Sequence, residues 1–193
     1  MRIAECREVL ASTLARTTSS APEGTSLART GQAILRMASA YESDGRTFLS
    51  GDDPVNALAA FLYALGWLHC GIASGVIVCS GGNPLCPFAT PAENVPASHY
   101  LKLEEKTGRY ARLLETAIAS VTPAPAPGTP AHDFAVQVLF IAGIYLQNGR
   151  REVSEGRTEN ALSCFSYGHG WLDAGVGSGL FTIHANRGIF TVD

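Results

Sequence analysis

His169 and Asp173 are the two residues whose types and spacing come closest to forming a chemical site. On a helix, side chains four residues apart lie on one face, so this pair could hydrogen-bond or share a metal ion. A zinc-type site needs a third and a fourth ligand, and none follows at helical spacing. His184 and Asp193 lie downstream, at positions that the pattern does not place. We therefore interpret the pair as a buried histidine held by its carboxylate, and we predict neither a metal nor another cofactor.

Both tryptophans of the chain follow a tyrosine at the same spacing, in Tyr63-x-x-x-Trp67 and Tyr167-x-x-x-Trp171. These rings could line a ligand pocket, but aromatic residues at helical spacing more often pack a core. The motifs GxSxG and HExxH are absent and no nucleophile has an obvious base, so we predict no catalytic residues. The candidate binding residues are Tyr63, Trp67, His69, Tyr167, His169, Trp171 and Asp173.

Charge and cysteine content narrow the class of protein. The net charge of −3 lacks the basic excess typical of nucleic-acid-binding proteins. Five cysteines, an odd number without CxxC spacing, favour reduced thiols, with a Cys79–Cys86 disulfide as the alternative. The first 16 residues are charged throughout and lack the apolar centre of a signal peptide. We therefore expect a cytoplasmic protein that does not bind nucleic acid.

The elements that must position these residues form an internal repeat. When the sequence is shifted by 104 positions, residues 41–77 lie over residues 145–181 without a gap. Similarity of this kind indicates two tandem copies of one unit. Identical pairs include Tyr41/Tyr145, Gly45/Gly149, Asn56/Asn160, Phe61/Phe165, Tyr63/Tyr167, Gly66/Gly170, Trp67/Trp171 and Gly71/Gly175.

Periodicity and turn residues predict three helices in each copy and no sheet. The third helix of the first copy follows Asp53-Pro54, a capping residue with proline at the first helical position. The predicted helices cover 2–17, 26–49 and a segment from residue 54, then 99–120, 131–154 and a segment from residue 158.

The predicted fold is all-α, with two tandem three-helix up-and-down bundle units packed as a pseudo-symmetric six-helix protein. We place the first unit at 1–80 and the second at 99–193, including a C-terminal tail. Residues 81–98 are rich in glycine and proline and form the predicted linker.

Residues 57–79 are as long and apolar as a membrane span. The equivalent segment 161–183, however, carries His169 and Asp173, and a charged residue at mid-membrane costs about 2.5–3.5 kcal/mol. Because homologous helices share an environment, we expect both to be buried in a soluble bundle without membrane contact.

The third helix carries two packing stripes, which imply two packing partners. The second stripe recurs in both copies, and a self-complementary contact constrains the same patch on both sides. We therefore expect the two third helices to pack against each other across a pseudo-two-fold axis. We expect the closest backbone approach at the small residues Gly71 and Ser74. The stripe comprises Asn56, Ala60, Tyr63, Trp67, Gly71 and Ser74.

The segment that starts at Asn160, NALSCFSYGHGWLDAG, resembles the signature of an archaeal family, domain of unknown function 357. The resemblance implies small three-helix bundles without an established activity. The second copy departs from the pattern at Asn148, where the first copy keeps the acid as Asp44. The first copy departs at Leu65 and His69, which replace the histidine and the aspartate.

Two classes of function follow. We expect a non-enzymatic interaction or assembly module that binds a protein partner or associates with itself through helical faces. The alternative is a small-molecule or metal-binding protein, catalytic or not, with a site near His169 and Asp173 at the repeat junction. An exposed apolar groove on the third helices would favour the first class. A closed polar pocket around His169 and Asp173 would favour the second.

Overall fold

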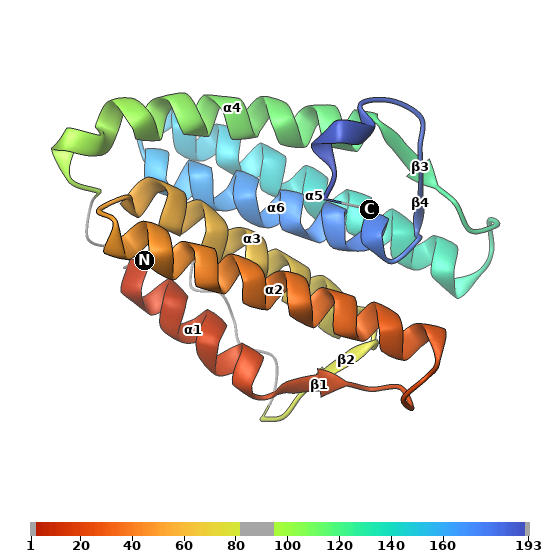
Figure 1. The fold of residues 1–193 in the computed structure, drawn as a ribbon. Helices are drawn as coiled ribbons and strands as arrows, with labels where there is room; N and C mark the ends of the chain where they lie inside the picture. The colour runs from red at the N-terminus through yellow and green to blue at the C-terminus, as the bar shows by residue number, and fades with distance from the viewer. Residues whose placement is uncertain (1–2, 82–94, 192–193) are drawn as a thin grey trace.

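The computed structural model describes residues 3–81 and 95–191, and their six long helices confirm the predicted all-α class (Figure 1). The second and third helices of the two copies correspond residue for residue at the offset of 104. The linker predicted at 81–98 falls largely on 82–94, outside the described residues, so the unit boundaries stay a prediction. The helices are α1 (Ile3–Ala15), α2 (Ser26–Ser50), α3 (Pro54–Ala73), α4 (Tyr100–Ala119), α5 (Pro130–Ser154) and α6 (Thr158–Gly177).

The expectation of no sheet was wrong, because each unit contains one short antiparallel ribbon (Figure 1). β1 (Thr17–Ser19) pairs with β2 (Ile77–Cys79), and β3 (Val121–Pro123) pairs with β4 (Phe181–Ile183). Each ribbon joins the end of a unit's first helix to the end of its third. Strands of three residues are too short to show the alternation by which a strand is recognised in a sequence.

Local signals explain where the helices begin and end. The Asp53 side chain accepts a hydrogen bond from the Asn56 N–H, as predicted for the start of α3. Thr25 and Thr129 cap α2 and α5 in the same way. Beyond α3 and α6, Gly75 and Gly179 adopt positive φ angles of 75° and 76°, a conformation that glycine adopts without strain. Small polar residues thus cap the starts of α2, α3 and α5, and glycines follow the ends of α3 and α6, whereas α6 begins after Arg157 without a side-chain cap.

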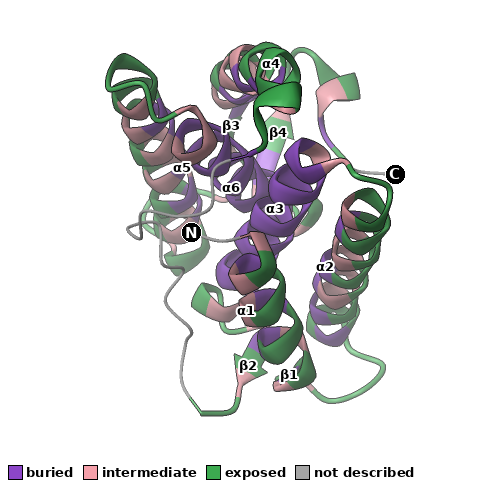
Figure 2. Cartoon of the chain, turned by 90° about the vertical axis from the view of Figure 1, so that its left-hand side faces the viewer, coloured by how far each residue is buried: buried purple, intermediate pink, exposed green. Residues whose placement is uncertain are grey.

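The core is built around α3 and α6, which lie at the centre of the protein (Figure 2). α1 and α2 cover α3, while α4 and α5 cover α6. Among the described residues, α3 is the one helix long and apolar enough to cross a membrane, and 89% of its most apolar window is buried. Its enclosure by α1, α2 and α6 is that of a core helix.

The predicted contact between the two third helices is confirmed, but its closest point differs from the expected one. A methyl group at Gly66 would lie 3.0 Å from Gly170 Cα and closer still to the Tyr167 carbonyl oxygen. Gly170 faces Gly66 and the Tyr63 carbonyl in the equivalent way. α3 and α6 therefore cross backbone to backbone at these two glycines.

Gly71 does not lie at this crossing, because two helices that cross at one point diverge on either side of it. A methyl group at Gly71 would instead meet Ile34 and Ile77 of its own unit. The Trp67 ring does reach the other copy, where it lies against Gly177 at the end of α6. The two units are thus joined along the middle of α3 and α6 and not loosely connected.

We predict that Gly66→Ala lowers the free energy of unfolding by about 2 kcal/mol or more, because a methyl group at the crossing must push two backbones apart. Gly143→Ala is the matched control, since Gly143 lies inside α5 and a methyl group there meets nothing within 4 Å. The control should gain up to about 1 kcal/mol from helix propensity. Urea unfolding measures both values, and equal stability of the two variants would contradict a tight crossing.

Candidate functional site

Two tyrosines reach across the repeat junction to equivalent positions of the opposite copy. The Tyr63 hydroxyl donates a hydrogen bond to Asp173 Oδ2, and the Tyr167 hydroxyl lies 2.7 Å from His69 Nδ1. Positions 69 and 173 are related by the offset of 104. Four of the predicted residues therefore form two pseudo-symmetric pairs, one with a carboxylate and one with an imidazole.

Asp173 is fully buried and holds the C-terminal segment against the junction. Its two carboxylate oxygens each lie 3.1 Å from the Thr191 backbone N–H. The Thr191 hydroxyl lies 2.9 Å from the Tyr63 hydroxyl, which closes a three-residue network. Asp173 thus receives hydrogen bonds from α3 and from the chain after β4.

The predicted His169–Asp173 contact is present, but it is not a hydrogen bond. His169 Nε2 lies 4.0 Å from Asp173 Oδ2, and the hydrogen bonds of this carboxylate go to Tyr63 and Thr191. The spacing in the sequence correctly predicted that His169 and Asp173 lie close together. It could not predict Tyr63 and Thr191 as the hydrogen-bond partners of Asp173, because they come from other parts of the chain.

His169 is buried, and its Nε2 faces the Asp173 carboxylate. Burial lowers its pKa, against the opposing effect of Asp173, so the ring is neutral at pH 7. Because Nε2 faces the carboxylate, we assign the proton to Nε2, which leaves Nδ1 as an acceptor. Nδ1 has no hydrogen-bond partner among the described residues.

A cavity of about 290 Å³ opens beside His169, between α2, α3, α4 and the C-terminal segment, and we call it the junction cavity. Of the predicted residues, Tyr63 and His169 line it, whereas Trp67 lines a separate groove of about 850 Å³ between α2 and the end of α6. The polar and aromatic residues that line the junction cavity are Tyr41, Asp44, Phe48, Asn56, Tyr63, Lys106, Tyr110, His169 and Thr191.

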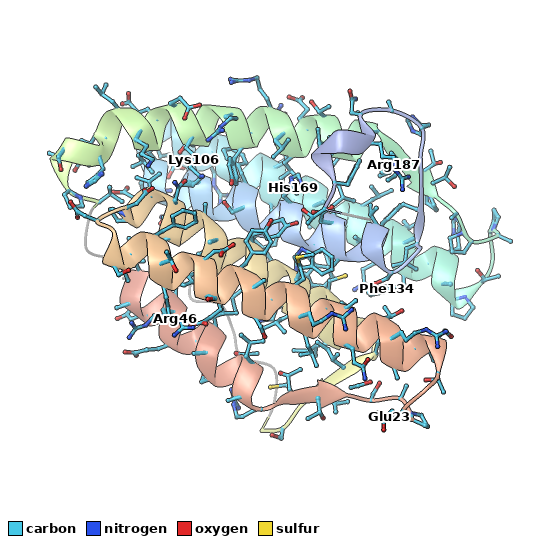
Figure 3. All side chains as sticks on the ribbon, viewed as in Figure 1. Glu23, Arg46, Lys106, Phe134, His169 and Arg187 are labelled. Carbon is cyan, nitrogen blue, oxygen red and sulfur yellow. The ribbon has the colours of Figure 1, made fainter. Side chains whose placement is uncertain are left out.

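Lys106 is the cationic residue of this cavity, and it was not predicted as a site residue from the sequence (Figure 3). Its side chain is 7% exposed, its ammonium group donates to Asn56 Oδ1, and it lies 4.8 Å from the centre of the Tyr110 ring. Burial lowers its pKa to about 8, with Arg109 acting in the same direction. No described carboxylate forms an ion pair with it. A usable signal was present, because Lys102 and Lys106 are the chain's only lysines and lie one helical turn apart.

A metal-binding site was the alternative predicted from the sequence, but the described part of the chain provides no set of metal ligands. No three His, Cys, Asp or Glu side chains gather there in an arrangement that could hold a metal ion. The cavity instead combines one ammonium group, one exposed carboxylate, one imidazole and several aromatic rings, which suits an organic ligand.

We predict that Asp173→Asn lowers the free energy of unfolding by about 1–3 kcal/mol, because a buried carboxylate that accepts from both Tyr63 and Thr191 is lost. Tyr63→Phe removes one of the same hydrogen bonds and should cost less. Urea unfolding at pH 7 measures both effects. Wild-type stability of Asp173→Asn would show that the network contributes nothing to folding.

His69 should make the protein less stable in acid. Burial lowers its pKa in the folded state to about 4, below the ordinary value of 6.5. The unfolded chain therefore binds a proton first as the pH falls, and stability is lost between pH 6.5 and 4. We expect His69→Gln to reduce the loss between pH 7 and pH 5 by about 2 kcal/mol. Urea unfolding at the two pH values tests this, and an unchanged loss would contradict it.

The comparisons with known proteins agree with the duplicated architecture. One family profile, described as "Protein of unknown function (DUF357)", matches residues 7–77 and again residues 109–181. No curated protein and no solved structure shows a significant match. The two matched segments correspond to the two copies and cover most of the chain. The chain therefore belongs to the DUF357 family of proteins of unknown function, with two tandem copies of its domain.

Proposed function

We propose that this protein binds a small aromatic carboxylate in the junction cavity, without catalysing a reaction on it. The observation that carries the proposal is Lys106, a buried ammonium group beside a cavity and without a carboxylate partner among the described residues. Lysine is almost never buried unless its charge is paired. An anionic ligand would supply the missing charge.

The other groups of the cavity restrict the ligand further. Tyr41, Tyr63 and Tyr110 line the cavity and offer aromatic surfaces on which a flat ring can pack. The volume of about 290 Å³ lies at the lower limit for small-molecule sites, which selects a compact molecule. His169 lines the cavity as a neutral imidazole, so a hydroxyl group on the ligand ring, which can donate or accept a hydrogen bond, would improve the fit. Asp44 is exposed, and water screens its charge.

We also propose that the protein works in the reducing cytoplasm. Cys70 and Cys164 are buried thiols that form no disulfide, as expected in a reducing compartment. Cys86, the partner in the alternative Cys79–Cys86 disulfide, lies outside the described residues.

Titration calorimetry with 4-hydroxybenzoate, benzoate and neutral benzamide tests the binding proposal. We expect 4-hydroxybenzoate to bind most tightly and benzamide not to bind. Lys106→Gln should weaken binding about tenfold or more, because a hydrogen bond to a charged group is worth about 1.5–3 kcal/mol. Binding should persist below pH 8 and weaken above it, as the Lys106 ammonium group loses its proton.

The matched control is Lys102→Gln, one helical turn away, where the lysine is half-exposed and pairs with Asp53. It should bind 4-hydroxybenzoate as the wild type does. Equal loss in both lysine variants would indicate a general charge effect, and absence of binding to either acid would refute the proposed ligand class.

A further inference from the structure

The outer face of α5 carries the most extended row of exposed apolar side chains in the described part of the chain. Val136, Phe140 and Ile144 follow one another at four-residue spacing, with 47%, 67% and 40% of their surfaces exposed. Side chains at this spacing lie along one face of a helix. Phe140, the largest of them, stands at the centre of the row.

The first copy lacks this row, so it is not a requirement of the fold. The equivalent positions on α2 are Gln32, Arg36 and Ala40. Buried positions of the two helices, in contrast, match: Ile34 and Ala38 correspond to Val138 and Ala142. The apolar surface therefore belongs to the second copy alone and marks a candidate site for a partner.

The charges around the row indicate what that partner is. The exposed face continues through Gln137 and Gln147 to an acidic residue, Asp133, at one end and a basic residue, Arg151, at the other. Arg151 forms no ion pair with a described residue, and the Asp133 side chain is 78% exposed, with a long contact of 3.7 Å to His132. One end of the face is thus negative and the other positive.

This order of residues is self-complementary for an antiparallel contact. When two copies of α5 lie antiparallel with Phe140 opposite the second copy's Ile144, the same register places Gln137 opposite Gln147. It also places Asp133 opposite Arg151, at both ends of the contact. In this register Val136 lies opposite Asn148, while the other named groups of the face each meet a group of the same face, as a two-fold contact requires.

We propose that two molecules of this protein associate through α5, packed antiparallel about the midpoint between Phe140 and Ile144. The assembly gives a concrete form to the self-association expected from the sequence and does not involve the junction cavity. One helix face is smaller than the roughly 800 Å² per partner of a standard interface. We therefore expect the dissociation constant of the dimer to lie in the micromolar range or above.

Sedimentation equilibrium of the whole chain between about 1 µM and 1 mM tests the proposal. We expect a monomer–dimer equilibrium in the wild type. Phe140→Arg, which introduces the residue that the first copy has at this position, should abolish it. Leu27→Arg is the control, because Leu27 is 58% exposed on α2 and lies outside the row. It should leave the equilibrium unchanged, and circular dichroism verifies that both variants are folded.

Charge exchange tests the register. Asp133→Arg and Arg151→Asp should each weaken association by about threefold or more, because each places like charges opposite each other at both ends. The double variant should recover the wild-type equilibrium. A monomer at 1 mM, an effect of Leu27→Arg equal to that of Phe140→Arg, or a double variant weaker than either single variant would overturn the proposal.

Discussion

The backbone crossing of α3 and α6 at Gly66 and Gly170 is the constraint on which the rest of this structure depends. Only glycine lets the two helix axes approach so closely, since any larger residue would meet the opposite backbone. The approach turns both third helices into one shared core, with α1 and α2 on one side and α4 and α5 on the other. Each three-helix unit thereby buries the face that it could not cover alone.

The same crossing determines where polar groups can meet. The hydroxyls of Tyr63 and Tyr167, beside the crossing glycines, reach positions 173 and 69 of the opposite helix. A buried polar group is stable only with a hydrogen-bond partner, so the residue opposite each tyrosine must be able to pair with its hydroxyl, as Asp173 and His69 both do. Unlike His69, Asp173 also accepts a hydrogen bond from the Thr191 N–H, and it thereby holds the C-terminal segment in place.

The fold could be predicted well from the sequence because the duplication repeats each residue pattern that indicates a helix or a helix end. Asn56, Tyr63 and Trp67 each recur 104 residues later, which identified the helices, their ends and the contact between the copies. The site was predicted only in part. Lys106 comes from the longer start of α4, Thr191 from the chain after β4, and Tyr41 from α2. Their meeting depends on tertiary packing, which helical spacing within one element cannot reveal.

Fusion of the two units into one chain allows the two copies to carry different residues at equivalent positions. In a dimer of identical units, every substitution occurs twice. A histidine at position 169 would therefore be matched by a second histidine at the symmetry-related position. In the fused chain, Leu65 fills the equivalent position, and only one copy carries the imidazole. Gly66 and Gly170 are the same in both copies because the close approach of the two backbones requires glycine. The cavity beside His169 and the row around Phe140 are not subject to this requirement, and there the two copies differ in sequence.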